Sequence, residues 1–430
     1  MLFRDITILD EDLNVVEHQY VGVLGDKIAY IGGQMPQEDF GESYDGKNKI
    51  LMTGLFNSHT HLPMTLLRGY AENKNLQDWL FNRIFPFEAK MNSEDVYYAA
   101  LLGMAEMIRF GTISATEMYF HTESIIKAAI DCGVKLNISA GTVAFDDGPL
   151  SENKNFREEQ AYYRQYHLAE GGRIRADMSL HAEYTTNARL VQELAEYCAE
   201  RDQGIHVHVS ETRQEVLDCK KRHDGLTPPE YLAGLGLFQS RVTAAHCVWL
   251  EPQDFDLLAS NHVTVAHCPV SNMKLASGVA DVPQMLERGI NVALGTDGVA
   301  SNNNFDLWED MKIYAMIHKC NKLDPTLITP RQVLQAATVN GAIGQGREDC
   351  GCLKVGNKAD LIVVNCDNTR MTPIHSLINN IVYSMDSSDV VLTMVDGKIL
   401  YRDGEFTTID LEKVMEKVKA SKERIVQELG

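Results

Sequence analysis

The chain has 430 residues, 40 of them basic and 60 acidic, which gives a formal net charge of −20 at pH 7. This excess of acid repels phosphate backbones and anionic lipids, so we expect neither a nucleic acid nor a membrane as a partner. The apolar share of 44% is ordinary for a globular protein and excludes a disordered or fibrous chain.

Signals of membrane insertion or export are missing from the sequence. No segment approaches the roughly 18 unbroken apolar residues of a membrane-spanning helix. The first residues, MLFRDITILDEDLNVVEH, carry acids where a signal peptide has its apolar core. The nine cysteines are an odd number and are spread over the chain, as expected of reduced thiols in a cytoplasmic protein.

The predicted elements change in character along the chain. Residues 1–49 contain short runs such as DITILD and KIAYIGG, which are typical of hairpin strands. From residue 50 onward, β-branched runs alternate with helical periodicity, as in the predicted helices Glu94–Arg109, Ala188–Arg201 and Phe305–Lys319. The predicted strands are Ile50–Phe56, Thr112–Met118, Lys135–Val143, Ala176–His181, Gly204–Val209, Val242–Cys247, Val263–His267 and Asn291–Leu294.

Eight strand–helix units in series are what a (β/α)8 barrel requires. Residues 353–406 return to hairpin strands with a turn at Asp396-Gly397, and residues 409–428 have the periodicity of an amphipathic helix. We therefore predict an α/β protein. Residues 50–352 form a (β/α)8 TIM barrel, and residues 1–49 and 353–430 form a small β-sandwich domain, built from both chain ends, that includes the C-terminal helix.

Histidine pairs follow two of the predicted barrel strands. His59 and His61 close the first strand, and residues at i and i+2 share a face, so both imidazoles can point at one ion. The fifth strand carries His206 and His208, with Glu211 three residues later. Two core histidines bonded to carbonyl groups are an alternative. That alternative suits His206, which lies deeper in the strand, better than His208.

Two further side chains lie at the ends of strands six and eight, namely His246 and Asp297. Taken singly, each is compatible with a turn or a helix cap. Taken together, the polar side chains from four strands meet at the carboxyl-terminal face, where barrel enzymes build their active sites. Nitrogen and oxygen donors without a thiolate favour a zinc or iron(II) site, formed by His59, His61, His208, His246 and Asp297.

The segments around these residues resemble a known family. HTH, HVHVSET, AAHC and LGTDG are similar to motifs of the amidohydrolase superfamily. TLLRGYAENKNLQDWL, PFEAK, HCPVSNMKLASGVADVP and LGTDGVASNNNFDLWEDM look like those of the methylthioadenosine/S-adenosylhomocysteine deaminase group, which has chlorohydrolase-like and guanine-deaminase-like relatives. The resemblance covers essentially the whole chain.

The resemblance implies a role for each candidate residue. One divalent metal ion, zinc or alternatively iron(II), would be held by His59, His61, His208 and Asp297. His246 would polarise the attacking water or the developing oxyanion, Glu211 would be the proton shuttle, and Asp297 would accept a proton. The substrate contacts would be His181 and Glu88, which matches a carboxylate that holds ribose hydroxyls. Independently of the resemblance, Trp79 follows strand one together with Phe81, Phe85 and Phe87, and these rings either cover the substrate, which makes Trp79 a further candidate contact, or lie in the core.

The sequence departs from the group at two places. Members that accept S-adenosylhomocysteine hold its carboxylate with arginines after strand three, where this chain has Ala140 and Pro149. Neutral residues cannot replace charge-assisted hydrogen bonds from arginine, although Arg157 or Arg164 could compensate from a helix. Glu183 stands where relatives commonly have proline, and it is either a carboxylate near the pocket that favours a cationic substrate or a solvated surface acid.

We therefore expect a cytoplasmic, metal-dependent aminohydrolase that deaminates the adenine ring of a small nucleoside such as 5′-methylthioadenosine or 5′-deoxyadenosine. One alternative is a related hydrolase of a free heterocycle, such as guanine, a pterin or an s-triazine, including the chlorohydrolase type. Another is a barrel that has lost its activity. A small molecule is the expected partner, and we expect a homo-oligomer.

Overall fold

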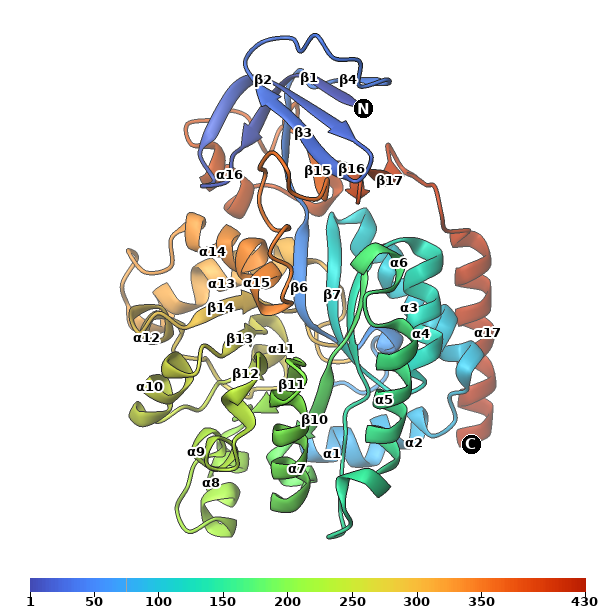
Figure 1. Ribbon diagram of the computed structural model, residues 1–430, viewed down its shortest axis with the longest axis vertical. Helices are drawn as coiled ribbons and strands as arrows, with labels where there is room; N and C mark the ends of the chain where they lie inside the picture. Colours follow the sequence, from blue (N-terminus) through green and yellow to red (C-terminus); the bar gives the residue numbers. More distant parts are fainter. Residues whose placement is uncertain (75) are drawn as a thin grey trace.

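A sheet built from both chain ends lies above a barrel in the computed structural model, which describes residues 1–74 and 76–430 (Figure 1). Asn75, within TLLRGYAENKNLQDWL, lies outside the described residues. The nine-stranded sheet has the order β18-β17-β16-β15-β5-β1-β2-β3, with β4 paired to β1. Its strands are β1 (Leu2–Leu9), β2 (Val15–Leu24), β3 (Lys27–Gly32), β4 (Ser43–Asp45), β5 (Lys49–Thr53), β15 (Leu361–Asn365), β16 (Val390–Val395), β17 (Lys398–Arg402) and β18 (Glu405–Phe406).

The barrel consists of two parallel sheets that meet edge to edge, and β9 and β10, separated only by Asp177, together form one of its eight strands. The strands are β6 (Leu55–Thr60), β7 (Thr112–Met118), β8 (Lys135–Ser139), β9 (Ile174–Ala176), β10 (Met178–Ala182), β11 (Ile205–Val209), β12 (Val242–His246), β13 (Thr264–His267) and β14 (Asn291–Leu294). Between β9 and β10, the Asp177 N–H donates to the Ile138 carbonyl, and the next N–H, of Met178, donates to Gly204. The other seam closes where the Asp297 N–H donates to the His59 carbonyl. The predicted (β/α)8 TIM barrel is therefore confirmed.

Helices surround the barrel strands (Figure 1). The longest are amphipathic and capped. For example, Asn92 caps α3 in a reciprocal pair with Asp95. The helices are α1 (Leu76–Trp79), α2 (Phe85–Glu88), α3 (Ser93–Arg109), α4 (Thr122–Cys132), α5 (Lys154–Tyr166), α6 (Ala169–Gly172), α7 (Ala188–Ala199), α8 (Arg213–Arg222), α9 (Pro228–Gly234), α10 (Pro252–Ser260), α11 (Pro269–Lys274), α12 (Val282–Glu287), α13 (Leu307–Lys322), α14 (Pro330–Ala337), α15 (Val339–Gly344), α16 (Leu377–Tyr383) and α17 (Leu411–Leu429).

One strand predicted over residues 50–56 is two strands in the structure, so that prediction is wrong. β5 ends at Thr53 and pairs with β1 and β15 in the terminal sheet, whereas β6 begins at Leu55 in the barrel. Gly54 lies at the junction because the chain packs tightly there. A Cβ at this position would lie 2.4 Å from the Ile113 Cγ2 atom. The division at residues 49/50 and 352/353 stays a prediction.

The C-terminal helix α17 lies against α3, and Lys417 Nζ is 2.9 Å from Glu94 Oε1 (Figure 1). This packing anchors the chain end to the outside of the barrel. Among the described residues, none of the helices combines the length and the apolar character that a bilayer crossing requires.

Candidate metal centre and its pocket

A pocket of about 460 Å³ lies at the carboxyl-terminal ends of the barrel strands. In Figure 1 this end points away from the terminal sheet. The volume is in the usual range of about 300–1,000 Å³ for small-molecule sites. Nearly all the predicted site residues line the pocket, namely His61, Trp79, Glu88, His181, His208, Glu211, His246 and Asp297. The remaining one, His59, is fully buried and its ring centre is 4.8 Å from those of His61 and His208.

The structure brings the five candidate ligands together. The ligand atoms of His59, His61 and His208 lie within 4.8 Å of one another, and so do those of His59, His246 and Asp297. Asp297 Oδ1 is 3.5 Å from His59 Nε2 and 3.3 Å from His61 Nε2. We refer to these five residues as the histidine end of the pocket.

Strand alternation explains why both histidines of β6 point into the barrel. Thr60, between them, points to the opposite side, where its hydroxyl donates to Glu117 Oε2 at 2.6 Å. The Leu62 N–H donates to the same carboxylate oxygen at 2.9 Å. Glu117 therefore holds the chain on both sides of His61.

Hydrogen bonds orient the imidazole rings. The Nδ1 atom of His61 is 2.7 Å from the Met118 carbonyl oxygen, and that of His208 is 2.7 Å from the His181 carbonyl oxygen. A carbonyl oxygen only accepts, so each Nδ1 carries the proton and each Nε2 keeps a lone pair. His59 Nδ1 instead lies 2.9 Å from Nε2 of His206. Its own Nε2 is buried and has no hydrogen-bond partner among the described residues.

Burial and neighbouring charges set the protonation states. Burial lowers the pKa of His59 to about 3 and lowers that of His208 well below its usual range, so both are neutral near pH 7. Burial acts to raise the pKa of Asp297, but the imidazoles of His59 and His61, 3.5 and 3.3 Å from its Oδ1 atom, hold it well below its usual range. Neutral imidazoles beside an ionised carboxylate are a donor set that fits one divalent metal ion.

Glu211 lies close to His246, one of the five candidate ligands, and the two form a functional pair. His246 Nδ1 is 2.9 Å from Asn272 Oδ1, and its Nε2 is 3.9 Å from Glu211 Oε2. Burial lowers the pKa of His246, but the charges of Glu211 and Asp297 outweigh it and raise the pKa above 6.5. Burial raises the pKa of Glu211. Both shifts favour the protonated form of each group, so the pair can hold and pass a proton.

Backbone strain coincides with two of these residues. His246 has a φ of 74° and Asp297 a φ of 64°, both in the left-handed region. Side chains other than glycine enter this region at a cost, and such residues gather at functional sites. Both residues lie where the chain leaves the barrel wall, His246 at the end of β12 and Asp297 three residues beyond β14.

Sequence reasoning missed the side chains that support the site. The hydroxyls of Ser271 and Ser301 donate to Asp297 Oδ2 at 2.6 and 3.0 Å, and the Ser277 hydroxyl donates to Glu211 Oε1 at 3.1 Å. Ser271, Asn272 and Ser277 belong to the stretch HCPVSNMKLASG after β13. The resemblance was the only signal that could have pointed to them, because serine and asparagine are common in turns.

A further carboxyl group lies in the pocket wall, at the end of α2. The Tyr119 hydroxyl donates to Glu88 Oε1 at 2.5 Å, and burial raises the pKa of Glu88 to about 7. Trp79 is buried and faces the pocket, whereas Phe87 packs against Tyr70 in the core and does not line the pocket. Of the four aromatic residues, Trp79, Phe81 and Phe85 therefore line the pocket, and Phe87 lies in the core.

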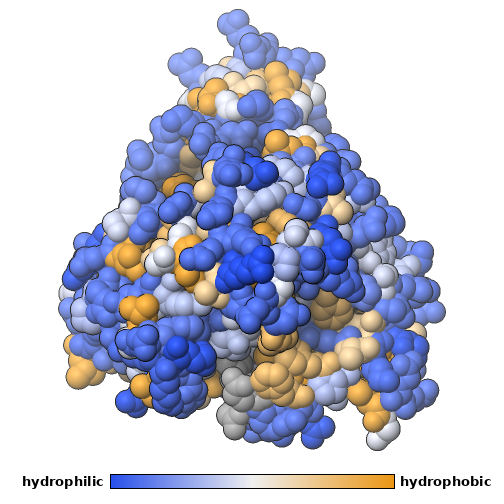
Figure 2. All heavy atoms as spheres, turned by 60° about the horizontal axis from the view of Figure 1, so that its bottom comes forward, coloured by the Kyte–Doolittle hydropathy of each residue, from blue (hydrophilic) through white to orange (hydrophobic). Residues whose placement is uncertain are grey.

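Exposed aromatic rings surround the pocket entrance. Phe81 and Phe85 form an edge-to-face pair with ring centres 5.3 Å apart, and Phe145 lies on the loop after β8. Their exposed fractions are 54%, 41% and 84%. We call these three residues the mouth. Figure 2 views this end of the molecule and shows apolar surface gathered on it among hydrophilic residues.

Glu183 fits neither interpretation from the sequence, since it is buried and does not line the pocket. Its Oε2 is 2.6 Å from Arg222 Nη2, and its Oε1 is 2.7 Å from His223 Nε2. Glu183 and His223 also lie near the Cys219 thiol, in a group that can hold a metal ion. Because Arg222 and His223 engage both carboxylate oxygens, this cluster links the turn after β10 to the C-terminal end of α8.

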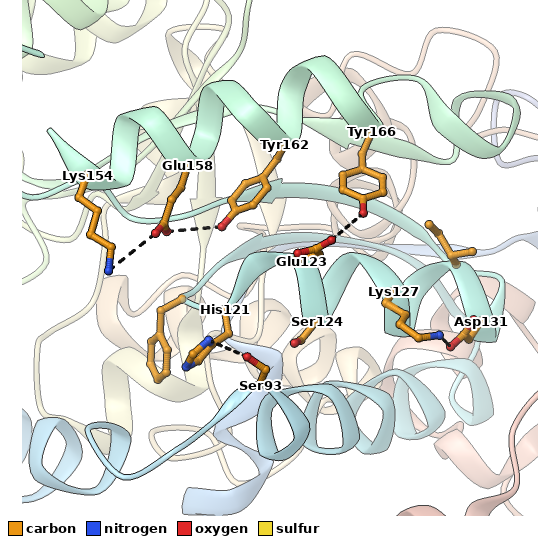
Figure 3. Close-up of a pocket in the computed structure, with 12 residues that line it drawn as sticks. Ser93, His121, Glu123, Ser124, Lys127, Asp131, Lys154, Glu158, Tyr162 and Tyr166 are labelled. Carbon is orange, nitrogen blue, oxygen red and sulfur yellow. Dashed lines mark hydrogen bonds and ion pairs between the residues drawn. The ribbon is translucent and has the colours of Figure 1, made fainter. Parts of the chain in front are cut away.

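A second cavity, of about 710 Å³, lies between α4 and α5 on the outside of the barrel (Figure 3). Its polar side chains pair with one another instead of converging on a common point. Lys127 Nζ lies 2.7 Å from Asp131 Oδ2, and the Tyr166 hydroxyl oxygen lies 3.1 Å from Glu123 Oε1. Ser93 Oγ lies 3.2 Å from His121 Nδ1. None of the predicted site residues lines it, so the barrel pocket is the better candidate.

Comparison with known proteins agrees with this geometry. The Amidohydrolase family model matches residues 50–400. A 5-methylthioadenosine/S-adenosylhomocysteine deaminase of Dictyoglomus thermophilum is 42% identical over 415 residues, which cover 96% of each chain. A 5′-deoxyadenosine deaminase of Methanosarcina mazei is 41% identical over 421 residues, which cover 98% of this chain and 96% of that protein. The crystal structure of an adenosine deaminase from Xanthomonas campestris with bound zinc has a TM-score of 0.92 at 29% identity, covering 99% of this chain and 98% of that one.

Proposed function

Because the chain belongs to the amidohydrolase family and is a hydrolase that acts on C–N bonds, we propose that it deaminates the adenine ring of a small nucleoside of the 5′-methylthioadenosine or 5′-deoxyadenosine type. The observation that carries the proposal is the histidine end. There, neutral imidazoles and an ionised carboxylate share one end of a pocket whose wall contains Glu88. The names of the relatives support the choice of an adenine nucleoside.

The residues present fit a divalent metal ion. We propose that His59, His61, His208 and Asp297 hold it. We favour zinc because the similar adenosine deaminase structure contains it, and iron(II) suits the same donors. When bound, such an ion lowers the pKa of a water molecule from about 15.7 to about 7 and so supplies a nucleophile at neutral pH.

The side chains around the ligands handle the protons. Glu211, whose pKa is raised by burial, donates a proton to the ring nitrogen beside the attacked carbon. The attacking oxygen loses its proton to Asp297, and His246 directs its Nε2–H at the developing negative charge. Asn272 holds the other nitrogen of His246, which leaves Nε2 for this role. Asp297 passes the proton that it accepted to the amino group, whose bond to the ring carbon breaks, and the group departs as ammonia.

The pocket wall favours a nucleoside without an acidic tail. Glu88 accepts hydrogen bonds from the ribose hydroxyls, while His181 and Trp79 contact the substrate. The described residues that line the pocket include no lysine or arginine. Ala140 lines the pocket, whereas Arg157 and Arg164 do not, so neither arginine stands in for the missing clamp. A carboxylate such as that of S-adenosylhomocysteine would have no cationic partner.

Ammonia release from zinc-loaded protein tests this function. The panel contains 5′-methylthioadenosine, 5′-deoxyadenosine, adenosine, S-adenosylhomocysteine, guanine, a pterin and melamine. We expect the two 5′-deoxynucleosides to be turned over at least about tenfold more efficiently than S-adenosylhomocysteine, since loss of a charged hydrogen bond costs more than 1.4 kcal/mol. Turnover of a free base without turnover of any nucleoside would overturn the proposal.

Homo-oligomeric assembly and a cytoplasmic location stay predictions. Light scattering on the purified protein tests the first, and fractionation of the source cells tests the second.

A further inference from the structure

Two buried histidines inside the barrel form a hydrogen bond that the proposed chemistry leaves unexplained. His206 on β11 is 1% exposed, and its Nε2 is 2.9 Å from His59 Nδ1. We propose that His206 is a positioning residue, which holds His59 in the tautomer and ring orientation that binding the metal ion through Nε2 requires. This inference rests on the metal binding proposed above.

The other ligand histidines show why a partner is needed. The protein backbone orients two of them, because His61 and His208 each direct Nδ1 at a carbonyl oxygen 2.7 Å away. His59 is the third, and the partner of its Nδ1 is a side chain. Such outer partners of metal-bound histidines set the tautomer and the basicity of the ligand. Among these three, only the orientation of His59 can therefore be tested by replacing the partner side chain.

Metal binding through Nε2 of His59 would fix the positions of the protons in this pair. A neutral imidazole carries one N–H. For His59 to present a lone pair on Nε2, its Nδ1 must carry that proton and donate it to Nε2 of His206. His206 then carries its own proton on Nδ1. That atom is buried and has no hydrogen-bond partner among the described residues.

An unpartnered buried N–H opposes folding, so an apolar side chain would suit this position better if packing were its only role. The ring planes of His59 and His206 stand at 87° with centres 5.0 Å apart, and the 2.9 Å contact between them joins one nitrogen of each ring. His206 does not line the pocket and belongs to neither group of candidate ligand atoms. It therefore acts through His59 and does not bind the ion itself.

The experiment compares two replacements of nearly equal shape. His206→Gln keeps an acceptor close to the position of Nε2, whereas His206→Met removes it. The matched control is His267→Leu, because His267 on β13 is equally buried and both of its ring nitrogens lack partners among the described residues. Its ring lies 5.2 Å from Tyr314 and 5.3 Å from His318 in centre-to-centre distance. Each protein is first checked by circular dichroism and by its melting temperature without metal.

The readout is the zinc dissociation constant, measured by competition with a chelator in the absence of nucleoside. We expect His206→Met to weaken zinc binding about 10–100-fold, as for other outer-shell partners. His206→Gln should stay within about threefold of the wild type, and His267→Leu should bind zinc normally. The absorption spectrum of cobalt(II)-loaded protein should change with His206→Met and not with His267→Leu.

Two results would overturn the inference, namely wild-type zinc affinity in His206→Met or an equal loss in the Gln and Met variants. If His206→Met does not fold, His206→Leu takes its place in the comparison with Gln. Because no nucleoside is present, failure of the deaminase proposal leaves these zinc affinities interpretable. Conversely, unchanged zinc affinities would leave the nucleoside assay standing.

Discussion

The histidine end of the pocket and the mouth are built in opposite ways. At the histidine end, His59 is fully buried, and hydrogen bonds of 2.7–2.9 Å fix the Nδ1 atoms of His59, His61 and His208. At the mouth, Phe145 is 84% exposed, and its ring carries no hydrogen-bonding group. Directional bonds determine position to within a fraction of an ångström, whereas apolar contact does not depend on direction.

We therefore expect the histidine end to determine the rate of the chemical step and the mouth to determine which substrates bind. A substitution at the histidine end should change the rate with every substrate, because each substrate meets the same groups. A substitution at the mouth should change mainly KM, and only for substrates whose substituent reaches it. Glu88 lies between the two regions. The following predictions test this separation, from the largest expected effect to the smallest.

Asp297→Asn should have the largest effect. The amide keeps the shape but removes both the negative charge that suits a metal ligand and the proton acceptor, so we expect kcat to fall about 10⁴-fold with all nucleosides. Steady-state ammonia release together with zinc content measures both losses. Asp281→Asn, which removes a carboxylate paired with Lys322 on α13, is the control and should keep full activity. Retention of a tenth of the activity by Asp297→Asn would contradict its role.

Glu211→Gln should lower kcat about 10²–10³-fold, because the variant cannot transfer a proton to the ring. Zinc content should stay at the wild-type level, since Glu211 belongs to neither group of candidate ligand atoms. Loss of zinc together with activity would place Glu211 among the ligands instead. The exposed Glu196 on α7, changed to Gln, is the matched control.

Glu88→Gln should change how stability depends on pH. Burial raises the pKa of Glu88 to about 7 from 4.5, so ionisation of the folded protein is unfavourable relative to the unfolded chain. The destabilisation is absent below about pH 4.5 and complete above about pH 7. Between pH 4.5 and 8, the free energy of unfolding of the variant should rise by about 2 kcal/mol relative to that of the wild type. This figure is smaller than the full pKa shift would give, because the side chain is partly exposed to the pocket. Urea unfolding at pH 4.5 and at pH 8 measures this change. The same stability difference between variant and wild type at both pH values would refute the raised pKa of Glu88.

Phe145→Ala should have the smallest effect and one confined to the mouth. We expect KM for 5′-methylthioadenosine to rise about tenfold, or about 1.4 kcal/mol, while kcat stays the same, because we expect the ring to cover the 5′ substituent in the complex. KM for adenosine, whose 5′ hydroxyl gains less from apolar contact, should change less. Leu168→Ala removes an exposed apolar side chain that does not line the pocket and serves as the control. A fall in kcat with both substrates would erase the distinction between the two regions.

The barrel and the grouping of candidate ligands could be predicted because both follow from local patterns. The alternation of apolar runs and helical periodicity indicated the strands, and the side-chain period of two placed His59 and His61 on one face. The break at Gly54 was missed, since its cause is the approach of Ile113 from a neighbouring strand. The place of Glu183 was missed for the same reason, because its partners Arg222 and His223 belong to a different element.

By itself, then, the sequence determined the fold class, the end of the barrel that carries the chemistry and the kinds of ligand available there. These depend on strand and helix periods, which are properties of the backbone over a few residues. Only the tertiary structure decided which groups orient the ligands, such as Ser271 against Asp297 and His206 against His59, the latter pair 147 residues apart in the chain. A hydrogen bond forms only when two atoms approach to about 3 Å, and such proximity between distant segments arises from the packing of the whole barrel.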